Sequence, residues 1–358
     1  MCELRKIRVL QVIDGLGAGG KERQLIELLR LIDPDKFIVG VVTFSILHQH
    51  YVTEALRLAA FFRELNLKRK IRLFKEMKHS IAEFDPDLIH TWDTFSSFYA
   101  LRPARSAGIP LIDGSIRDAG VERRWEYLYK RYFLKHADVI VSNSRAGLKY
   151  YHVSGEVIYN AIDRSRFRAV EQSDQFNIIM SASFTAYKDH DTFFRAARCL
   201  LEDGVVDNVY LAGDGPKLDK YRRLVKRSFG ALKQRVQFLG RVSDIEKWLS
   251  RCRIGVLCST KRYSEGISNS ILEYMAAGLV PIATEVGAVP EIIDDRINGL
   301  LVQARDWHGI VAAVRQLRQD DAYLKRLIEN AGLTIMNQFD ARNNISRFMS
   351  LYQNALAK

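Results

Sequence analysis

The chain has 358 residues, of which 47% are hydrophobic and 27% are charged, and its net charge is +12. This length is too great for one ordinary hydrophobic core and predicts two domains of about 150–180 residues. The excess of cationic residues predicts an anionic partner, which leaves nucleic acid, acidic lipid and phosphorylated substrates open.

Several classes of protein are excluded by what the sequence lacks. No run approaches the ~18 apolar residues of a membrane span, and no signal-peptide pattern precedes the first apolar run, so we expect a cytoplasmic protein. The four cysteines, Cys2, Cys199, Cys252 and Cys258, show no metal-ligand spacing. We therefore predict free thiols, without a zinc site, another metal site or a disulfide framework.

The first half of the chain alternates short apolar runs with helical patterns. The runs predict strands at Ile7–Ile13, Phe37–Phe44, Asp87–Thr91, Pro110–Ile112 and Val139–Ser142, and the helical patterns cover Lys21–Leu31 and Tyr127–Lys135. Strands that alternate with helices are typical of a parallel sheet covered by helices.

The same alternation restarts after the polar stretch Asp163–Gln175. It predicts strands at Phe176–Ser181, Val209–Ala212, Val236–Leu239, Ile254–Cys258 and Pro281–Ala283, and helices at Asp191–Glu202 and Lys217–Phe229. We predict an α/β protein with two Rossmann-like β/α/β domains, residues 1–165 and 166–339, followed by a helix within 340–358. Because such sheets bind ligands at the carboxyl ends of their strands, two facing sheets predict a cleft between the domains.

A glycine-rich loop follows the first predicted strand. Gly15, Gly17 and Gly20 satisfy the G-x-G-x-x-G spacing of dinucleotide-binding loops. That fingerprint also needs an acid after the second strand to bind ribose, and Val42–Ser45 offers none. An NAD(P) site is therefore not predicted, and no cofactor is expected.

Two carboxylates, Glu265 and Glu273, flank a second loop. Glu265 follows the apolar run Ile254–Cys258, and Ser270 precedes Glu273 with the Ser-x-x-Glu spacing of a capping box, which predicts Glu273 in the first turn of a helix. The small residues between the two acids offer backbone N–H groups at a helix N-terminus, which favours an anionic or hydroxyl-rich ligand such as a sugar nucleotide.

The run EGISNSILEYMAAGLVPI resembles the Glu-x7-Glu signature of the retaining family-four glycosyltransferases. The resemblance implies that Glu265 contacts the donor sugar, that Glu273 binds the nucleotide ribose, and that backbone amides between them hold sugar hydroxyls and phosphate oxygens. The residues of that segment are Gly266, Ile267, Ser268, Asn269 and Ser270.

Further segments are similar to the same family, in the family's order. GAGGKERQL resembles its opening glycine loop, which implies a phosphate- and acceptor-side role for Gly17, Gly19 and Gly20, whereas we interpret Glu22 as a first-turn helix charge. LAGDGP and VQFLGR resemble turns near the nucleotide base, which brings Gly213, Asp214 and Arg241 into the donor site. VIYNAID, EVGAVPE and NGLLV match other family segments. The family's last helix packs back on the N-terminal domain, and 340–358 is expected to do so here.

Two departures from the family pattern bear on the chemistry. The family places an Arg five residues before a Lys, and both neutralise the leaving diphosphate; here Ser183 stands at the Arg position and Lys188 is kept. Arg241 or a basic residue of the N-terminal domain would then compensate. The family often has a His after its fourth strand, where this chain has Arg117. His90 is a second acceptor-side candidate, with a buried strand-end histidine as its alternative.

The resemblance implies a GT-B enzyme that transfers a sugar from a UDP- or GDP-sugar to a glycan or lipid-linked acceptor, with retention and without a metal, in surface polysaccharide or lipopolysaccharide assembly. Glu265, Lys188 and Arg117 are its predicted catalytic residues. A nucleic-acid-binding protein is the alternative from another class, although no nucleic-acid-binding motif is evident and no nucleic-acid partner is expected. A sugar-nucleotide epimerase or phosphorylase on the same fold is the third alternative.

Two basic segments with interleaved apolar residues suggest contact with an anionic membrane. Arg63–Lys78 carries seven cationic and two anionic side chains, and Trp125–Lys135 is aromatic and basic by turns. We predict reversible membrane binding through the first segment, with Lys68, Arg69, Lys70 and Arg72 as its main cations. The alternative for both segments is a solvated helix face whose apolar stripe packs on the domain.

Overall fold

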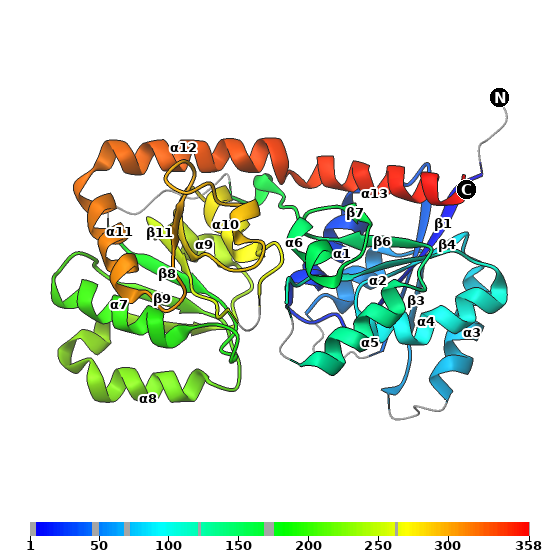
Figure 1. The fold of residues 1–358 in the computed structure, drawn as a ribbon, viewed down its shortest axis with the longest axis horizontal. Coiled ribbons are helices and arrows are strands. Elements are labelled where there is room, and N and C mark those ends of the chain that lie inside the picture. The colour runs from blue at the N-terminus through cyan, green and yellow to red at the C-terminus, as the bar shows by residue number, and fades with distance from the viewer. Residues whose placement is uncertain are drawn as a thin grey trace. The chain divides into compact units, whose positions relative to one another are not determined.

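The structure is a computed structural model that describes residues 5–44, 50–67, 72–120, 123–167, 175–261 and 264–357. The chain divides into two units (Figure 1). Unit 1 is Met1–Ala161 with Ala341–Lys358, and unit 2 is Ile162–Asp340. The boundaries predicted from the sequence lie between residues 165 and 166 and between 339 and 340.

Unit 1 contains a parallel sheet of seven strands in its described residues, in the order β3-β2-β1-β4-β5-β6-β7. The strands are β1 Ile7–Ile13, β2 Phe37–Thr43, β3 Phe61–Glu64, β4 Leu88–Thr91, β5 Leu111–Ile116, β6 Val139–Ser142 and β7 Glu156–Val157. The central strands β1, β4 and β5 are buried along almost their whole length because helices cover both faces of the sheet.

The helices of unit 1 turn an apolar stripe toward that sheet. They are α1 Gly20–Leu31, α2 Val52–Leu58, α3 Leu73–Phe84, α4 Thr94–Ala107, α5 Arg124–Leu134, α6 Arg145–Tyr151 and α13 Ala341–Leu356. Helix α13 is contributed from the end of the chain: Ile345, Phe348 and Tyr352 join the core formed by β1, β2 and α1. The C-terminal helix therefore belongs structurally to unit 1.

Unit 2 contains a parallel sheet of six strands in its described residues, in the order β10-β9-β8-β11-β12-β13. The strands are β8 Ile178–Ser181, β9 Val209–Ala212, β10 Val236–Gly240, β11 Ile254–Leu257, β12 Val280–Thr284 and β13 Leu300–Val302. The helices are α7 His190–Glu202, α8 Leu218–Ser228, α9 Ile245–Leu249, α10 Asn269–Ala276, α11 Trp307–Gln319 and α12 Asp321–Gln338. Short 3₁₀ helices lie at Arg164–Phe167, Gly230–Arg235 and Val289–Glu291.

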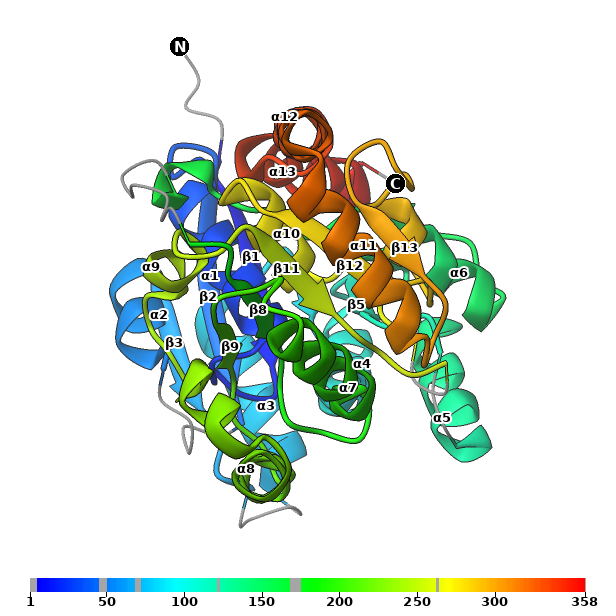
Figure 2. The same ribbon diagram turned by 90° about the vertical axis from the view of Figure 1, so that its left-hand side faces the viewer.

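Short polar residues start several helices in the loops that follow a strand. The Asp93 side chain accepts from the Ser96 N–H at the start of α4, and Asp189 accepts from the Thr192 N–H at the start of α7. A carboxylate at this position satisfies backbone N–H groups that have no partner within the helix. The helix starts are thereby fixed at the carboxyl edge of each sheet. In unit 2, α7 lies beside α11 (Figure 2).

Both sheets and their strand–helix alternation agree with the fold predicted from the sequence. The strands β3, β7 and β13, which are short, were not predicted from the sequence, and neither were the helices α2, α4, α6, α9, α11 and α12. None of the helices in the described ranges combines the length and the apolar character that crossing a bilayer requires. The described cysteines, Cys199, Cys252 and Cys258, are free thiols.

Candidate functional site

An ion pair between Lys188 and Glu265 lies at the carboxyl edge of the unit 2 sheet. Lys188 belongs to the loop between β8 and α7, and Glu265 belongs to the loop between β11 and α10. Because β8 and β11 are neighbouring parallel strands, their carboxyl ends bring the two loops together. The Nζ atom of Lys188 contacts Oε1 of Glu265, and both side chains are mostly buried.

Ser259 holds the Glu265 carboxylate in a fixed position. Its hydroxyl donates to Oε1 at 2.7 Å, and its own N–H donates to the Thr284 hydroxyl at 2.8 Å. Burial by itself would raise the pKa of Glu265, but the charge of Lys188 and the hydrogen bonds from Lys188 and Ser259 lower that pKa below its ordinary value. Glu265 is therefore ionised at neutral pH.

Helix α10 begins two residues earlier than the predicted capping box requires. Ser268 is the N-cap and makes no side-chain capping bond, while the Ser270 hydroxyl donates to the Ser181 carbonyl at 2.7 Å. The capping-box prediction is therefore wrong, because a tertiary acceptor takes the hydroxyl. Glu273 lies beyond the first turn, contrary to the prediction, and is almost completely buried.

Close packing sets the position of α10 on the sheet. The Tyr274 ring lies on Gly255 of β11, where an added Cβ would come within 2.2 Å of the ring. The Tyr274 hydroxyl accepts from the Ser181 N–H at 2.7 Å. These contacts fix the helix N-terminus beside the end of β8, where Gly266, Ile267 and Ser268 are buried and Asn269 and Ser270 are half-buried.

Gly287 supports the backbone of Glu265 and was not a predicted site residue. Its φ is +57°, and an added Cβ would lie 2.2 Å from the Glu265 carbonyl oxygen. The next N–H, that of Ala288, donates to the same oxygen at 2.8 Å. Only glycine fits this approach without strain.

Replacing Gly287 with alanine is expected to destabilise the fold by about 1–3 kcal/mol, because the residue combines left-handed backbone with a backbone clash. Activity should fall as Glu265 shifts. Gly332→Ala in α12 is the matched control, because nothing lies within 4 Å of its added Cβ, and it should be neutral or stabilising by up to about 1 kcal/mol. Urea unfolding of both variants measures this, and equal stabilities would contradict the assigned role of Gly287.

The remaining predicted donor residues line the neighbouring loops of unit 2. Gly213 has φ +140° and passes so close to Ala182 that an added Cβ would lie 2.1 Å from its carbonyl oxygen. The adjacent Asp214 side chain lies 3.9 Å from Arg241, and both are exposed. Ser183 is exposed, and its hydroxyl lies 3.4 Å from that of Thr185. Arg241 therefore pairs only loosely with Asp214.

A cavity of about 320 Å³ in unit 2 extends from Lys188 along the start of α7. Its wall combines four cationic side chains with two carboxylates and several neutral residues. The lining residues are Ala186, Lys188, Asp189, Asp191, Thr192, Arg195, Lys217, Tyr221, Thr260 and Arg305. No group of three or more His, Cys, Asp or Glu side chains in the described residues is arranged to hold a metal ion.

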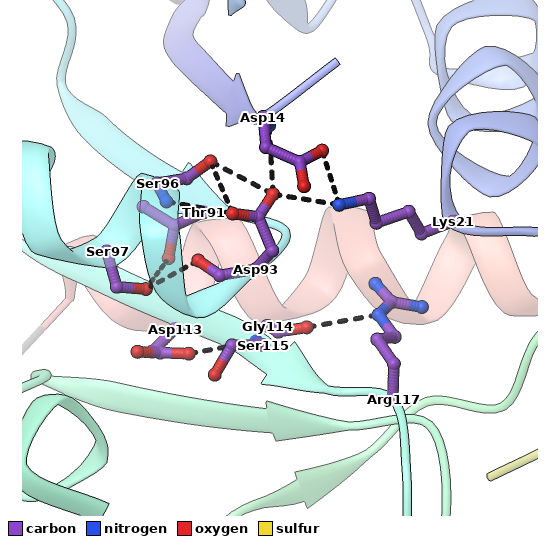
Figure 3. Close-up of polar contacts among 10 residues, drawn as sticks. All are labelled: Asp14, Lys21, Thr91, Asp93, Ser96, Ser97, Asp113, Gly114, Ser115 and Arg117. Atoms are coloured by element: carbon purple, nitrogen blue, oxygen red, sulfur yellow. Dashed lines mark hydrogen bonds and ion pairs between the residues drawn. The ribbon is translucent and has the colours of Figure 1, made fainter. Parts of the chain in front are cut away.

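A second polar cluster lies at the carboxyl edge of the unit 1 sheet (Figure 3). Lys21, from the first turn of α1, lies 2.5 Å from Asp14 and 3.2 Å from Asp93. Burial disfavours the charge of Lys21, but the two carboxylates raise its pKa to about 12. Burial and the neighbouring Asp93 raise the pKa of Asp14, against the effect of Lys21. The cluster holds a cation between two acids at the ends of neighbouring strands.

Arg117 extends from the end of β5 toward this cluster. Its Nε donates to the Gly114 carbonyl at 3.0 Å, its Nη1 donates to Asn160 at 3.1 Å, and its guanidinium carbon lies 4.5 Å from the Trp92 ring centroid. Nη2 is buried and has no hydrogen-bond partner among the described residues. Burial lowers the pKa of Arg117 to about 10, which leaves it charged at neutral pH.

His90 lies inside unit 1 and is fully buried. Its Nδ1 is 2.9 Å from the Tyr352 hydroxyl of α13, and the ring packs against Trp92 and Phe348. Burial and the charge of Arg117 lower the pKa of His90 to about 3, so the ring is neutral. This environment favours the alternative of a buried strand-end histidine over a direct contact with an acceptor.

The glycine loop of unit 1 ends at the start of α1. Gly19 is the N-cap and Gly20 the first helical residue; both are exposed, and Gly17 is half-buried. An added Cβ on Gly19 would lie 2.2 Å from a carboxylate oxygen of Glu22. Burial raises the pKa of Glu22 to about 7, so this first-turn acid titrates near neutral pH.

Sequence reasoning missed the acids of the unit 1 cluster. Asp14 directly follows β1, Asp93 lies two residues after the end of β4, and these strands are neighbours in the sheet. Their position after two neighbouring strands could have predicted that the two acids lie together. Ser259 gave no comparable signal, because a serine after a buried strand is common in loops.

Solved structures share the fold of this chain. HepE from Anabaena, in complex with UDP and glucose, has a TM-score of 0.82 at 17% identity and covers 97% of this chain and 99% of its own. A sucrose-phosphate synthase from Thermosynechococcus elongatus has a TM-score of 0.81 at 17% identity, over 98% and 100% of the two chains. The two Rossmann-like units define the GT-B fold of glycosyltransferases.

Family models match both units. Residues 18–166 match the model described as Glycosyltransferase Family 4, and residues 175–320 match the one described as Glycosyl transferases group 1. The chain belongs to the family-four glycosyltransferases. The family and the fold predicted from the sequence are thereby confirmed.

Curated relatives are distant. The N-acetyl-alpha-D-glucosaminyl L-malate synthase of Bacillus anthracis is 26% identical over 63% of this chain and 62% of its own length. The lipopolysaccharide core biosynthesis glycosyltransferase LpsE of Rhizobium meliloti is 25% identical over 81% of this chain and 82% of its own. An alpha-1,3-galactosyltransferase of Escherichia coli, whose name gives UDP-Gal as donor and a diphosphoundecaprenol acceptor, is 23% identical over 84% and 85%.

Proposed function

We propose that this glycosyltransferase transfers a sugar from a nucleoside-diphosphate sugar to a glycan or lipid-linked acceptor, with retention of anomeric configuration and without a metal ion. UDP is the preferred nucleotide, because HepE has been solved with UDP and the galactosyltransferase relative is named for UDP-Gal. The names of the lipopolysaccharide relatives support a role in surface glycan assembly. The buried Lys188–Glu265 pair is the observation that carries the proposal.

In this proposal the donor lies across the Lys188–Glu265 pair. The developing charge in the reaction is on the departing diphosphate, so a fixed cation and a helix N-terminus stabilise the transition state more than the ground state. Lys188 supplies the cation, and α10 supplies backbone N–H groups in its uncapped first turn. Glu265, held ionised by Lys188 and Ser259, contacts the donor sugar, and Glu273 contacts the ribose.

The acceptor side of the reaction is assigned to unit 1. Arg117 carries a buried N–H that has no partner among the described residues, and such a group is costly unless something binds to it. An oxygen of the acceptor, or of the donor phosphates, would supply that partner. The acids Asp14 and Asp93, which both pair with Lys21, would hold acceptor hydroxyl groups.

The first test is ligand binding by the full chain, followed by transfer. UDP at about 100 times its dissociation constant should stabilise the protein by about 2.7 kcal/mol, whereas GDP at the same concentration should do less. Transfer from a UDP-sugar should continue in EDTA, and NMR of the first product should show the donor's anomeric configuration. If no nucleotide changed the stability of the protein, the donor assignment would be contradicted. Loss of activity in EDTA would contradict metal independence. Epimerisation or phosphorolysis of the donor would favour the alternative enzymes.

A further inference from the structure

Helix α5 of unit 1 carries four large apolar or aromatic side chains on its solvent-facing side. Trp125 is 58% exposed, Leu128 54%, Tyr129 39% and Tyr132 53%. Their spacing of three and four residues places them on one face of the helix. A surface helix of a globular protein normally exposes its polar face, so this face is inverted.

The inverted face follows from how α5 is anchored. On the opposite side Phe133 and Leu134 are buried in the core, and Lys130 is buried with its Nζ 2.6 Å from Asp118. The same ammonium lies 4.7 Å from the Tyr151 ring centroid. The helix therefore cannot roll to bury Trp125 without breaking a buried ion pair, and the exposed stripe is a fixed surface.

Cationic residues surround this stripe. Arg123 and Arg124 precede the helix or begin it, Lys135 follows it, and all three are exposed. Between residues 123 and 135 Glu126 is the only acid in the sequence. Tryptophan and tyrosine next to arginine and lysine suit the headgroup region of an anionic bilayer, where rings lie among the lipids and cations meet phosphates.

The other basic segment, Arg63–Lys78, offers no comparable stripe in its described part. Leu65, Leu73 and Met77 are buried in the core of unit 1. Lys68, Arg69 and Lys70 lie outside the described residues, and Arg72 is exposed at the start of α3. These three residues are thus used for packing on the domain, and membrane binding through this segment stays a prediction.

We propose that the outer face of α5 binds reversibly to an anionic lipid bilayer. Figures 1 and 2 show α5 on the outside of unit 1. The helix follows Arg117 and Asp118 along the chain, and the Lys130–Asp118 pair ties it to the end of β5. A bilayer on this face would bring lipid-linked acceptors to the edge of the sheet that carries Arg117. This consequence for the acceptor rests on the proposed function.

The experiment is co-sedimentation of the full chain with phosphatidylcholine vesicles that contain, or lack, phosphatidylglycerol. We expect binding to the anionic vesicles at low salt and release at high salt. The variant Leu128→Ser with Tyr132→Ser should lose most of this binding. Its matched control is Leu333→Ser with Met336→Ser on α12, where the side chains are similarly exposed at 52% and 46%, and it should sediment like the unmodified chain.

A charge variant tests the same surface without changing its apolar residues. Arg123→Gln, Arg124→Gln and Lys135→Gln together should weaken vesicle partitioning by about a hundredfold, since each cation near an anionic surface contributes about fivefold. All of these positions are exposed, and thermal unfolding checks that the variants fold. The charge variant keeps the proposal testable if the apolar one does not fold.

Fluorescence locates the contact. Trp125→Phe keeps an aromatic ring and should still sediment, but it should lack the blue shift that the unmodified chain shows with anionic vesicles. Equal sedimentation of the chain and its α5 variants, or none by the unmodified chain, would overturn the proposal. A concentration-dependent dimer abolished by the apolar variant would also overturn it, by assigning the face to a second copy. The stabilisation of each variant by UDP should equal that of the unmodified chain. If UDP did not stabilise the unmodified chain, the proposed function would be contradicted but the membrane proposal would not.

Discussion

Replacing Glu265 with glutamine is expected to reduce sugar transfer by about 10²–10³-fold at saturating donor, the loss typical of removing one electrostatic contact from an active site. Glutamine keeps the shape of the side chain and removes its charge. In the unmodified chain Lys188 and Ser259 keep this carboxylate ionised despite burial. The variant therefore isolates the charge that we assign to the donor-sugar contact.

Two controls separate this effect from loss of folding. The ionised form of Glu265 stabilises the fold above the unfolded-state pKa of a glutamate, and that stability is lost as the pH falls through the lowered folded-state pKa. Glu265→Gln should therefore remove part of the stability at neutral pH and leave a cooperative unfolding transition. Glu329→Gln, at an exposed position of α12, should change neither rate nor stability. Wild-type turnover by Glu265→Gln would refute the role of the carboxylate.

The parts of the fold that were predictable are those set by local patterns. Strands β6 and β9 and the start and end of β1 lie where their apolar runs indicated, because a buried parallel strand needs a continuous apolar run. The short strand β3 was not predictable in this way, because it includes Arg63 and Glu64. It lies at the edge of the sheet and, among the described strands, pairs with β2 alone.

The parts of the site that were not predictable depend on contacts between distant segments. The Ser270 hydroxyl had a plausible local partner in a capping box, but the Ser181 carbonyl from another strand accepts it. The sequence places His90 at the end of a strand whether it contacts an acceptor or is buried. Its burial depends on Tyr352 of α13, which packs on it. Spacing along the sequence cannot report a partner that is contributed 262 residues later.

The orientation of α5 shows the same limit in a different way. Its sequence alternates aromatic and basic residues, so the pattern does not say which face packs on the domain. The Lys130–Asp118 pair decides the question, because it turns a cationic residue inward and leaves Trp125 and Tyr132 outside. A buried ion pair therefore sets the orientation of α5, whereas hydrophobicity alone would favour burial of the face that carries Trp125 and Tyr132.

Replacing Lys188 with alanine is expected to reduce the rate by about 10²–10³-fold, because the departing diphosphate loses its fixed cation. Lys188→Arg should recover part of that rate, since it restores the charge with different geometry. The control is Lys325→Ala on α12, which breaks an exposed pair with Asp321 of the kind that contributes little. Steady-state kinetics with a UDP-sugar donor provide the measurement.

The same substitution should change the pH dependence of the remaining activity, which a purely structural role for Lys188 would not do. Lys188 is the main cause that lowers the pKa of Glu265 against the effect of burial. Without it the Ser259 hydrogen bond alone opposes burial, so the pKa of Glu265 should rise. The acidic limb of the rate profile of Lys188→Ala should therefore move to higher pH, and Lys188→Arg should move it back. An unshifted limb, together with an unchanged rate, would show that the diphosphate is neutralised elsewhere, with the cavity residues Arg195, Lys217 and Arg305 as the next cations to replace.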